Sequence, residues 1–266
     1  MTYTKIPHDH PRAESLQVRE RLIRCYLDGI VAASGLIAHG RGEAFDYVLG
    51  ERTSEAALKA ISASIAMLLT AKNPVISVNG NTAALVPEEV VKLADVTGSK
   101  IEVNLFYRSS KRELAIQKLL EKVGAHEVFG VGKKASAKIP ELGSERRRVD
   151  PRGILAADVV VVPLEDGDRT EALIKMGKKV IAVDLNPLSR TAQKATISIV
   201  DNIVRSAPKM VEAAAKLKMQ NIKKRIDILK KFDNKKNLAE SINAIRENLT
   251  KLATQTCELD KQGGVA

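Results

Sequence analysis

The chain has 266 residues, 44% of them hydrophobic and none of them Trp, so it can form one large domain whose core must be aliphatic. No apolar run approaches the roughly 18 residues of a membrane-spanning helix, the first residues lack the apolar stretch of a signal peptide, and the two cysteines stand far apart. A membrane span, a disulfide framework and a zinc site are therefore not expected, which favours a cytoplasmic protein. The net charge of +11 suits the binding of nucleic acids or of small anions.

The first third of the chain is predicted to be helical, over residues 12–73. Leu16, Leu22 and Leu27 fall near helical spacing, and Gly29 is a plausible end for that helix. Residues 35–43 (GLIAHGRGE) are expected to form a glycine-punctuated loop. A long amphipathic helix is expected over residues 53–72.

From residue 74 to residue 218, short β-branched runs alternate with helical patterns. Parallel neighbouring strands need a crossover helix, so this alternation predicts an α/β fold with a mainly parallel sheet and helices on both faces. Residues 141–152 (ELGSERRRVDPR) form the most polar stretch and are expected to be an exposed loop or insertion. The strands are predicted at residues 75–78, 101–106, 158–162, 180–184 and 197–200, and the helices from about residue 87 to 97 and over residues 111–123, 169–176 and 204–218.

Residues 219–266 carry no strand signal and are predicted to be a basic helical extension. Its apolar residues step by four and three, as in a short coiled-coil seam, from Leu238 through Ile245 to Leu252. Two helices are expected, in a possible hairpin that packs on itself or on a partner chain. Binding of nucleic acid by this segment is not expected, because it lacks interleaved aromatic residues and any RNA-binding motif.

Three polar segments follow predicted strands, where ligands bind in open parallel sheets. In residues 184–191 (DLNPLSRT), Asp184 could hold ribose hydroxyls and Asn186 a base edge. The helix that opens at Ser189 would favour phosphate at its positive end. The alternative is that Asp and Asn merely cap a turn before a helix, and the pattern alone leaves both interpretations open.

The other two segments are residues 165–169 (EDGDR), with acids at Glu165, Asp166 and Asp168, and residues 79–82 (NGNT). The clustered acids would suit Mg²⁺ or an amine substrate, and the alternative is a solvated turn. The asparagines and the glycine could cradle an anion, and the alternative is an ordinary strand-to-helix turn. No G-x-x-x-x-G-K-[ST] phosphate loop is present, so arginines would have to meet the charge of a triphosphate, and the candidates are Arg19, Arg41 and Arg190.

Six segments, in the same order along the chain, resemble the archaeal phosphopantothenate synthetase (4-phosphopantoate–β-alanine ligase) family. They are residues 6–20 (IPHDHPRAESLQVRE), 34–51 (SGLIAHGRGEAFDYVLGE), 73–87 (NPVISVNGNTAALVP), 101–108 (IEVNLFYR), 159–193 (VVVVPLEDGDRTEALIKMGKKVIAVDLNPLSRTAQ) and 197–205 (ISIVDNIVR). The resemblance is expected to run from about residue 6 to about residue 218 and to leave the extension uncovered.

The resemblance implies a Rossmann-like fold and a cytoplasmic homodimer of coenzyme A biosynthesis. It implies the condensation of 4-phosphopantoate with β-alanine through an acyl-adenylate, with ATP converted to AMP and pyrophosphate and with Mg²⁺ expected. An ADP-forming ligase, a small-molecule kinase, or a nucleic-acid-binding protein that uses the basic extension remain as alternatives.

The resemblance also carries site residues over to this sequence. By the resemblance, the ATP contacts are expected at Arg19, Arg41, Asp184, Leu185, Asn186, Arg190, Thr191, Asn202 and Ile203. On physical grounds, Arg41 and Arg190, together with Arg19, are expected to neutralise charge on the leaving pyrophosphate, and Asp166 or Asp168 to orient the amine or bind Mg²⁺. No metal ligand is firmly assigned. The resemblance gives no mapping for phosphopantoate and β-alanine, whose contacts are expected from position alone at Asn79, Gly80, Asn81, Asp166 and Arg169.

Overall fold

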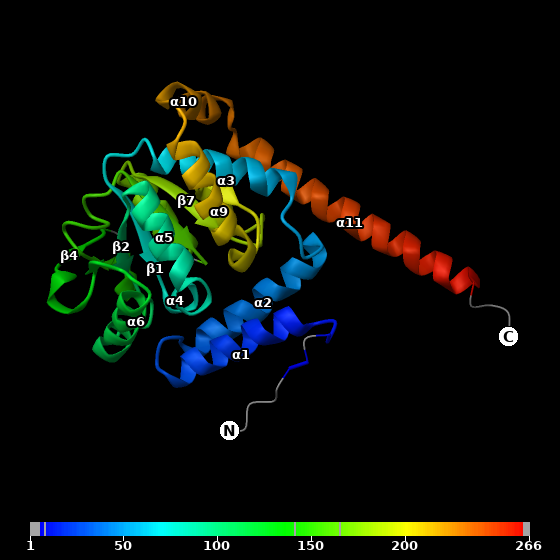
Figure 1. Ribbon diagram of the computed structural model, residues 1–266, viewed down its shortest axis with the longest axis horizontal. Coiled ribbons are helices and arrows are strands. Elements are labelled where there is room, and N and C mark those ends of the chain that lie inside the picture. The colour runs from blue at the N-terminus through cyan, green and yellow to red at the C-terminus, as the bar shows by residue number, and fades with distance from the viewer. Residues whose placement is uncertain (1–5, 8, 141, 165, 263–266) are drawn as a thin grey trace.

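A parallel sheet forms the centre of the molecule in the computed structural model, which describes residues 6–7, 9–140, 142–164 and 166–262 (Figure 1). Every strand pair in this sheet is parallel, which confirms the predicted α/β fold. The strands β2 and β3 are added on one side of β1, and β6, β7 and β8 are then added on its other side. The topological switch therefore lies between β1 and β6. Within the described residues the strand order is β3 (Val128–Phe129), β2 (Lys100–Val103), β1 (Pro74–Val78), β6 (Val159–Pro163), β7 (Lys179–Val183), β8 (Ile197–Ile199).

Alternation along the strands divides the core into two layers. Ile76, Val161 and Ile181 face the larger cluster, which the helices α3 (Glu55–Leu68), α5 (Pro87–Thr97) and α9 (Ile203–Lys218) complete on one face of the sheet. Val75, Val160 and Val180 face a second cluster, covered by α7 (Gly167–Lys175) and by the segment around residues 139–157. Since both faces are covered, the strands are apolar throughout, as expected of a parallel sheet.

The N-terminal helices α1 (Ala13–Leu27) and α2 (Ala33–Leu49) lie side by side beyond the carboxyl edge of the sheet (Figure 1). The loop predicted over residues 35–43 is wrong, because α2 runs through it. Its glycines permit close approach: a Cβ on Gly35 would lie 2.2 Å from Oδ1 of Asn81 in α4 (Gly80–Leu85). The remaining helices of the sheet region are α6 (Ser110–Lys122) and α8 (Arg190–Lys194).

Four of residues 142–152 are buried and three are exposed, so the exposed loop predicted over residues 141–152 is wrong in part; Glu141 itself lies outside the described residues. The segment contains the 3-10 turn η2 (Glu145–Arg147) and β5 (Arg148–Val149), which pairs antiparallel with β4 (Ala137–Lys138). Arg146, Val149 and Asp150 are all buried. The reason is chemical: buried Glu102 in β2 accepts hydrogen bonds from the amides of Asp150 (2.9 Å) and Ile154 (2.6 Å), which ties the segment to the sheet.

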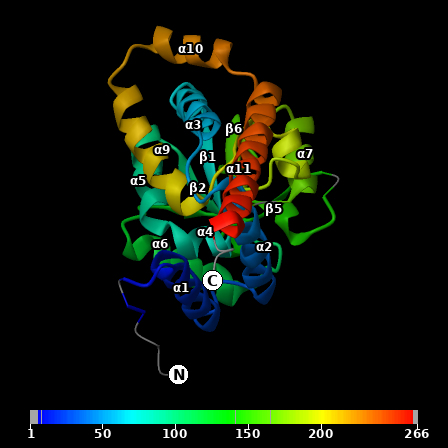
Figure 2. The ribbon, with the colours of Figure 1, turned by 90° about the vertical axis from the view of Figure 1, so that its right-hand side faces the viewer.

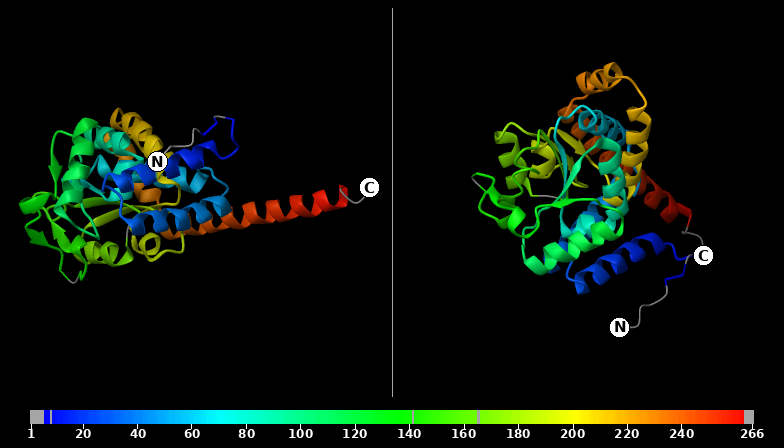
Figure 3. Two further views of the ribbon diagram at one scale, coloured as in Figure 1. Left: turned by 90° about the horizontal axis from the view of Figure 1, so that it is seen from below. Right: turned by 60° about the vertical axis from the view of Figure 1, so that its left-hand side comes forward.

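The C-terminal segment consists of α10 (Ile222–Lys231) and α11 (Asn234–Gln262). The two helices do not form a hairpin: α10 bridges the end of α9 and the start of α11 (Figure 2), and both contact α3. The first turns of α11 are anchored, since Leu238 is buried against Ala192 and Val200. About halfway along α11, Asn248 still donates to the carbonyl oxygen of Val48 (3.1 Å). Beyond it α11 projects from the body of the molecule (Figure 3). No described helix is long and apolar enough to cross a membrane.

Candidate functional site

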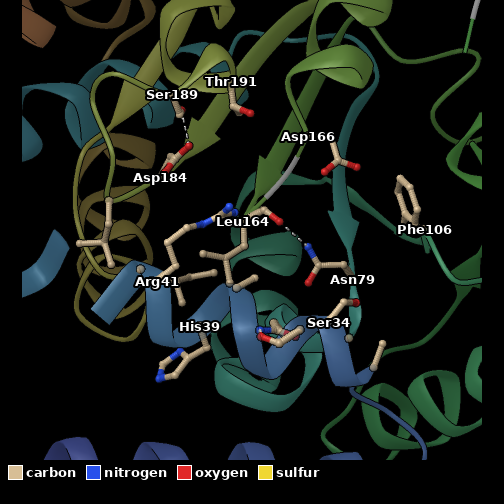
Figure 4. Close-up of a pocket in the computed structure, with 18 of the residues that line it drawn as sticks. Ser34, His39, Arg41, Asn79, Phe106, Leu164, Asp166, Asp184, Ser189 and Thr191 are labelled. Atoms are coloured by element: carbon tan, nitrogen blue, oxygen red, sulfur yellow. Dashed lines mark hydrogen bonds between the residues drawn. The ribbon is translucent and has the colours of Figure 1, made fainter. Parts of the chain in front are cut away.

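A cavity of about 730 Å³ opens at the carboxyl edge of the sheet, between the strand ends and α2. This is the position at which open parallel sheets bind ligands. Asn79 and Leu164 lie at the topological switch between β1 and β6, with Asp184 on one side and Phe106 on the other (Figure 4).

Most residues predicted for the site line this cavity, and their roles remain predictions. Two predicted residues, Arg19 and Arg169, do not line it, and Glu165 lies outside the described residues. The lining includes Arg41, Asn79, Gly80, Asn81, Asp166, Asp168, Asp184, Leu185, Asn186, Arg190, Thr191, Asn202 and Ile203.

The loop after β7 is a hydrogen-bonded turn as well as a wall of the cavity. Asp184 accepts from the amide of Asn186 (2.9 Å) and from the hydroxyl of Ser189 (2.5 Å). Burial raises the pKa of Asp184, while its hydrogen bonds and the charge of Arg41 oppose that shift. Ser189 caps α8, a helix of only five residues, so the phosphate-binding helix end predicted here is weak. The turn interpretation is confirmed, and the loop still presents its polar groups to the cavity.

Arg190 and Asp168 are brought together from α8 and the first turn of α7. Their side chains form an ion pair, and Glu171 Oε1 lies 3.9 Å from Nε of Arg190. Both members of the pair are more than half exposed. This pair closes one side of the cavity, with Gly167 leaving the space that the Arg190 side chain fills.

Arg41 rises from α2 toward Asp184, whereas His39 on the same helix points away from the cavity centre (Figure 4). Burial lowers the pKa of His39, with Glu43 and Arg19 as charged neighbours. Arg19 on α1 is held by Glu43, with Nη2 2.7 Å from Oε2. That hydrogen bond raises the pKa of Arg19. Arg19 therefore fixes Glu43 at the cavity wall and does not itself reach the cavity in this structure.

The two asparagines of the NGN segment are engaged in structural hydrogen bonds. Asn79 donates to the carbonyl oxygens of Pro163 (2.8 Å) and Leu164 (3.2 Å), and its Oδ1 accepts from the amide of Thr82. Asn81 donates to the carbonyl of Gly35 (2.8 Å). Asn79 thus joins β1 to β6 at the switch point and Asn81 joins α4 to α2, which favours the turn interpretation for their side chains.

Arg169 lies in the interior, with no exposed surface, and its Nη1 donates to Ser77 Oγ at 3.1 Å. It is placed beneath the cavity and not in it. A substrate contact through its guanidinium would need the surrounding β1 and α7 residues to move.

A buried charge network fixes α2 against the turn between β8 and α9. Arg205 binds Asp46 through both terminal nitrogens (2.9 and 2.5 Å) and Asp201 through Nη2 (2.8 Å). Asn202, at the cavity, also donates to Asp46 (2.8 Å). The network connects the helix that carries Arg41 to the segment that carries Asn202 and Ile203.

The sequence analysis missed the opposite end of the cavity. Arg112, Arg146, Phe106 and Tyr107 line it there. The only signal was the ERRR run at residues 145–148, whose polarity suggested exposure. Among the described residues, no group of three or more His, Cys, Asp or Glu side chains could hold a metal ion.

Comparison with known proteins adds the family. The sequence model described as phosphopantothenate/pantothenate synthetase matches residues 56–248 and so reaches 30 residues past the expected limit near residue 218, into the helical extension. A Methanosarcina mazei protein named 4-phosphopantoate–β-alanine ligase is 52% identical over 253 residues, which cover 95% of this chain and 99% of that protein. Proteins of the same name from Thermococcus onnurineus and Thermococcus kodakarensis are 54% and 52% identical, over 94% of this chain and 95% of each relative. The placement of the extension outside the resemblance is therefore wrong.

Proposed function

The chain belongs to the phosphopantothenate/pantothenate synthetase family, and we propose that its cavity joins 4-phosphopantoate to β-alanine with ATP, through an acyl-adenylate. The observation that carries this proposal is the convergence of sequence and geometry. Relatives named for this reaction match nearly the whole chain, and all the residues expected to bind ATP except Arg19 line one cavity at the carboxyl edge of the sheet.

The chemistry proceeds in two balanced steps. A carboxylate oxygen of 4-phosphopantoate attacks the α-phosphorus of ATP, and the bond to the bridging oxygen of pyrophosphate breaks. The neutral amine of β-alanine then attacks the activated carbonyl carbon, AMP leaves with the carboxylate oxygen, and the amine proton passes to water. The products are 4′-phosphopantothenate, AMP and pyrophosphate, and the product serves coenzyme A biosynthesis in the cytoplasm.

The adenosine end of ATP is assigned to the turn after β7, where Asp184 and Asn186 face the cavity beside Leu185. The phosphates would extend toward Arg41 and Arg190, whose planar guanidinium groups suit phosphate oxygens. Preorganised cations at the leaving pyrophosphate stabilise charge that develops in the transition state. Since Arg190 is paired with Asp168, ATP binding would compete with that carboxylate for the guanidinium.

Mg²⁺ is proposed to enter with the nucleotide. Magnesium in ATP sites is held largely by phosphates and waters with one or two carboxylates, so a preformed protein cage is not needed. Asp166 and Asp168 are the carboxylates at the cavity wall that fit this role. Bound there, Mg²⁺ would supply charge neutralisation on the phosphates.

A homodimer is part of the proposal, and the exposed apolar residues of α11 support it. Ile242, Leu249 and Leu252 are 39%, 45% and 47% exposed on this helix, at the spacing of a coiled-coil seam. Replacing Leu249 and Leu252 together by Asp should convert a dimer into a monomer, measured by light scattering. Deleting residues 219–266 is a poorer test, because it would also expose α3 and the pocket around buried Leu238.

The nucleotide product tests the reaction. Incubation with ATP, Mg²⁺, β-alanine and 4-phosphopantoate should yield AMP, whereas formation of ADP would favour an ADP-forming ligase or a kinase. Arg41→Ala should lower turnover by about 10²-fold while the protein stays folded, as for loss of one charge-stabilising donor. Arg52→Ala, an exposed arginine outside the cavity, is the matched control. Unchanged turnover in Arg41→Ala would remove Arg41 from the site.

A further inference from the structure

The cavity has a second cationic end, opposite the turn at Asp184. Arg112 reaches it from α6, and Arg146 reaches it from η2. Arg146 Nε lies 3.0 Å from Asp166, and Arg112 donates to the carbonyl oxygens of Tyr107 and Ile30. Asp166 and Phe106 stand across the cavity from Asp184 and Ser189 in Figure 4, so these contacts place both arginines on the far side.

Arg112 is partly buried and differs from three other enclosed arginines of the described chain. Arg108 is paired with Glu113, Arg146 with Asp166 and Arg205 with Asp46. Arg112 makes no ion pair with any described residue, and its buried Nε has no hydrogen-bond partner there. A guanidinium taken out of water needs a compensating anion, because carbonyl oxygens offset only part of the lost hydration.

Backbone atoms of other segments fix the position of the Arg112 guanidinium. Nη2 of Arg112 is 2.9 Å from the carbonyl oxygen of Ile30, and a Cβ on Gly80 would lie 2.9 Å from that nitrogen. Gly80 thus leaves the space that Arg112 occupies. Burial, and after it the charge of Arg146, lowers the pKa of Arg112. Both guanidinium-bearing residues line the same cavity, so one anion bound there would meet two positive charges.

We propose that Arg112 and Arg146 form a phosphomonoester subsite, which holds the phosphate of 4-phosphopantoate while its carboxylate points to ATP. This inference rests on the proposed function. The reacting carboxylate and the phosphate stand at opposite ends of that substrate, so a carboxylate beside the ATP phosphates puts the phosphate at the far end. The strands β2 and β7, which lie beneath the arginine end and the Asp184 end of the cavity, are three positions apart in the sheet, about 14 Å. This separation leaves room for 4-phosphopantoate and the adenylate end of ATP to lie in line.

The subsite also explains how phosphopantoate would be preferred over unphosphorylated pantoate. Arginine forks bind phosphate oxygens through paired charge-assisted hydrogen bonds. Pantoate would leave Arg112 without an anion, while Arg146 would keep Asp166 as its partner. Discrimination of this kind is strong, because the guanidinium of Arg112 stays uncompensated with the wrong substrate.

The test compares Arg112→Met, Arg112→Lys and Arg146→Met with Arg147→Met as the matched control. Arg147 is in the same turn as Arg146 but is 40% exposed, pairs with Glu145 and does not line the cavity. The KM for 4-phosphopantoate should rise about 10- to 100-fold in both methionine variants, as for loss of a charged hydrogen bond, with the KM for ATP changed less than about twofold. The preference for phosphopantoate over pantoate should fall by the same factor. Arg112→Lys should recover part of the loss, because it keeps the charge but not the fork.

Two outcomes would overturn the subsite. An unchanged KM for phosphopantoate would remove the arginines from that role, and an equal rise in the KM for ATP would assign them to the triphosphate instead. If Arg112→Met fails to fold, Arg112→Lys and Arg146→Met decide the matter in the same way.

Failure of the proposed function would look different, since the wild-type protein would then form no AMP. Calorimetry with inorganic phosphate still tests the subsite in that case. The wild-type chain and Arg147→Met should bind phosphate, and Arg146→Met should not. Equal binding by all three would refute the subsite whatever the reaction.

Discussion

Arg205→Met should be among the most damaging single substitutions in this protein outside the aliphatic core. Asp46 and Asp201 are 4% and 1% exposed, and Arg205 is the cation that binds both. Without it, two buried carboxylates remain with only neutral donors, namely Asn202 on Asp46 and Thr53 on Asp201. Removing one partner of a buried pair costs about 3–5 kcal/mol.

The assay is thermal unfolding followed by circular dichroism. For a chain of this size the loss corresponds to a fall in Tm of roughly 6–20 °C, at about 2–4 °C for each kcal/mol. The matched control is Lys59→Met, which breaks a 2.8 Å ion pair between Lys59 and Glu240 that is 58% and 48% exposed. An exposed pair of that kind contributes no more than about 1 kcal/mol.

Asp46→Asn in the Arg205→Met background completes the cycle. It should restore part of the stability, since it removes one of the two uncompensated charges. A loss in Arg205→Met as small as that in Lys59→Met would refute the argument that burial gives this network its importance.

Three further predictions concern charge, anchoring and close approach. Burial raises the pKa of Glu102 to about 7 from 4.5, so the folded state holds a proton that the unfolded state releases, and stability should fall by about 3 kcal/mol as pH rises between those values. Urea midpoints at pH 5 to 8 measure this, and Glu102→Gln should flatten the dependence; a flat profile in the wild type would contradict it. Leu238→Ala should cost about 2–5 kcal/mol in urea unfolding, because it opens the pocket that anchors α11, whereas Leu252→Ala in the monomer should stay within about 0.5 kcal/mol; equal losses would mean that α11 is not anchored at Leu238. Gly80→Ala should lose about 1–3 kcal/mol, since its Cβ would lie 2.4 Å from the carbonyl oxygen of Ile30, while Gly40→Ala, in open space within α2, should gain up to about 1 kcal/mol of helix propensity; a neutral Gly80→Ala would show that the Ile30 turn yields easily.

Several conclusions followed from the sequence by itself. Hydrophobic periodicity is a local property, so the strands at residues 74–78 and 179–183 and their crossover helices could be predicted from neighbours in the chain. The handedness and connection rules of parallel sheets then put every strand end, and so the candidate site, at one edge. The family resemblance rested on whole motifs, so the wrong predictions of local structure at residues 35–43 and 141–152 did not affect it.

What only the tertiary structure decided concerns contacts between segments distant in the chain. Glycines in residues 35–43 suggested a loop, but α2 runs through them. Gly35 lets α2 pack closely on α4, and no local rule contains that partner. Likewise the run at residues 145–148 is polar by composition, yet Arg146 within it is buried, since Glu102 in β2, more than 40 positions earlier, binds the amides that follow the run. The sequence shows where charged side chains lie along the chain, whereas the burial of those side chains and their ion-pair partners depend on the fold. This is the physical reason that Arg112 and Arg146 emerged as cavity residues only when the sheet brought their segments together.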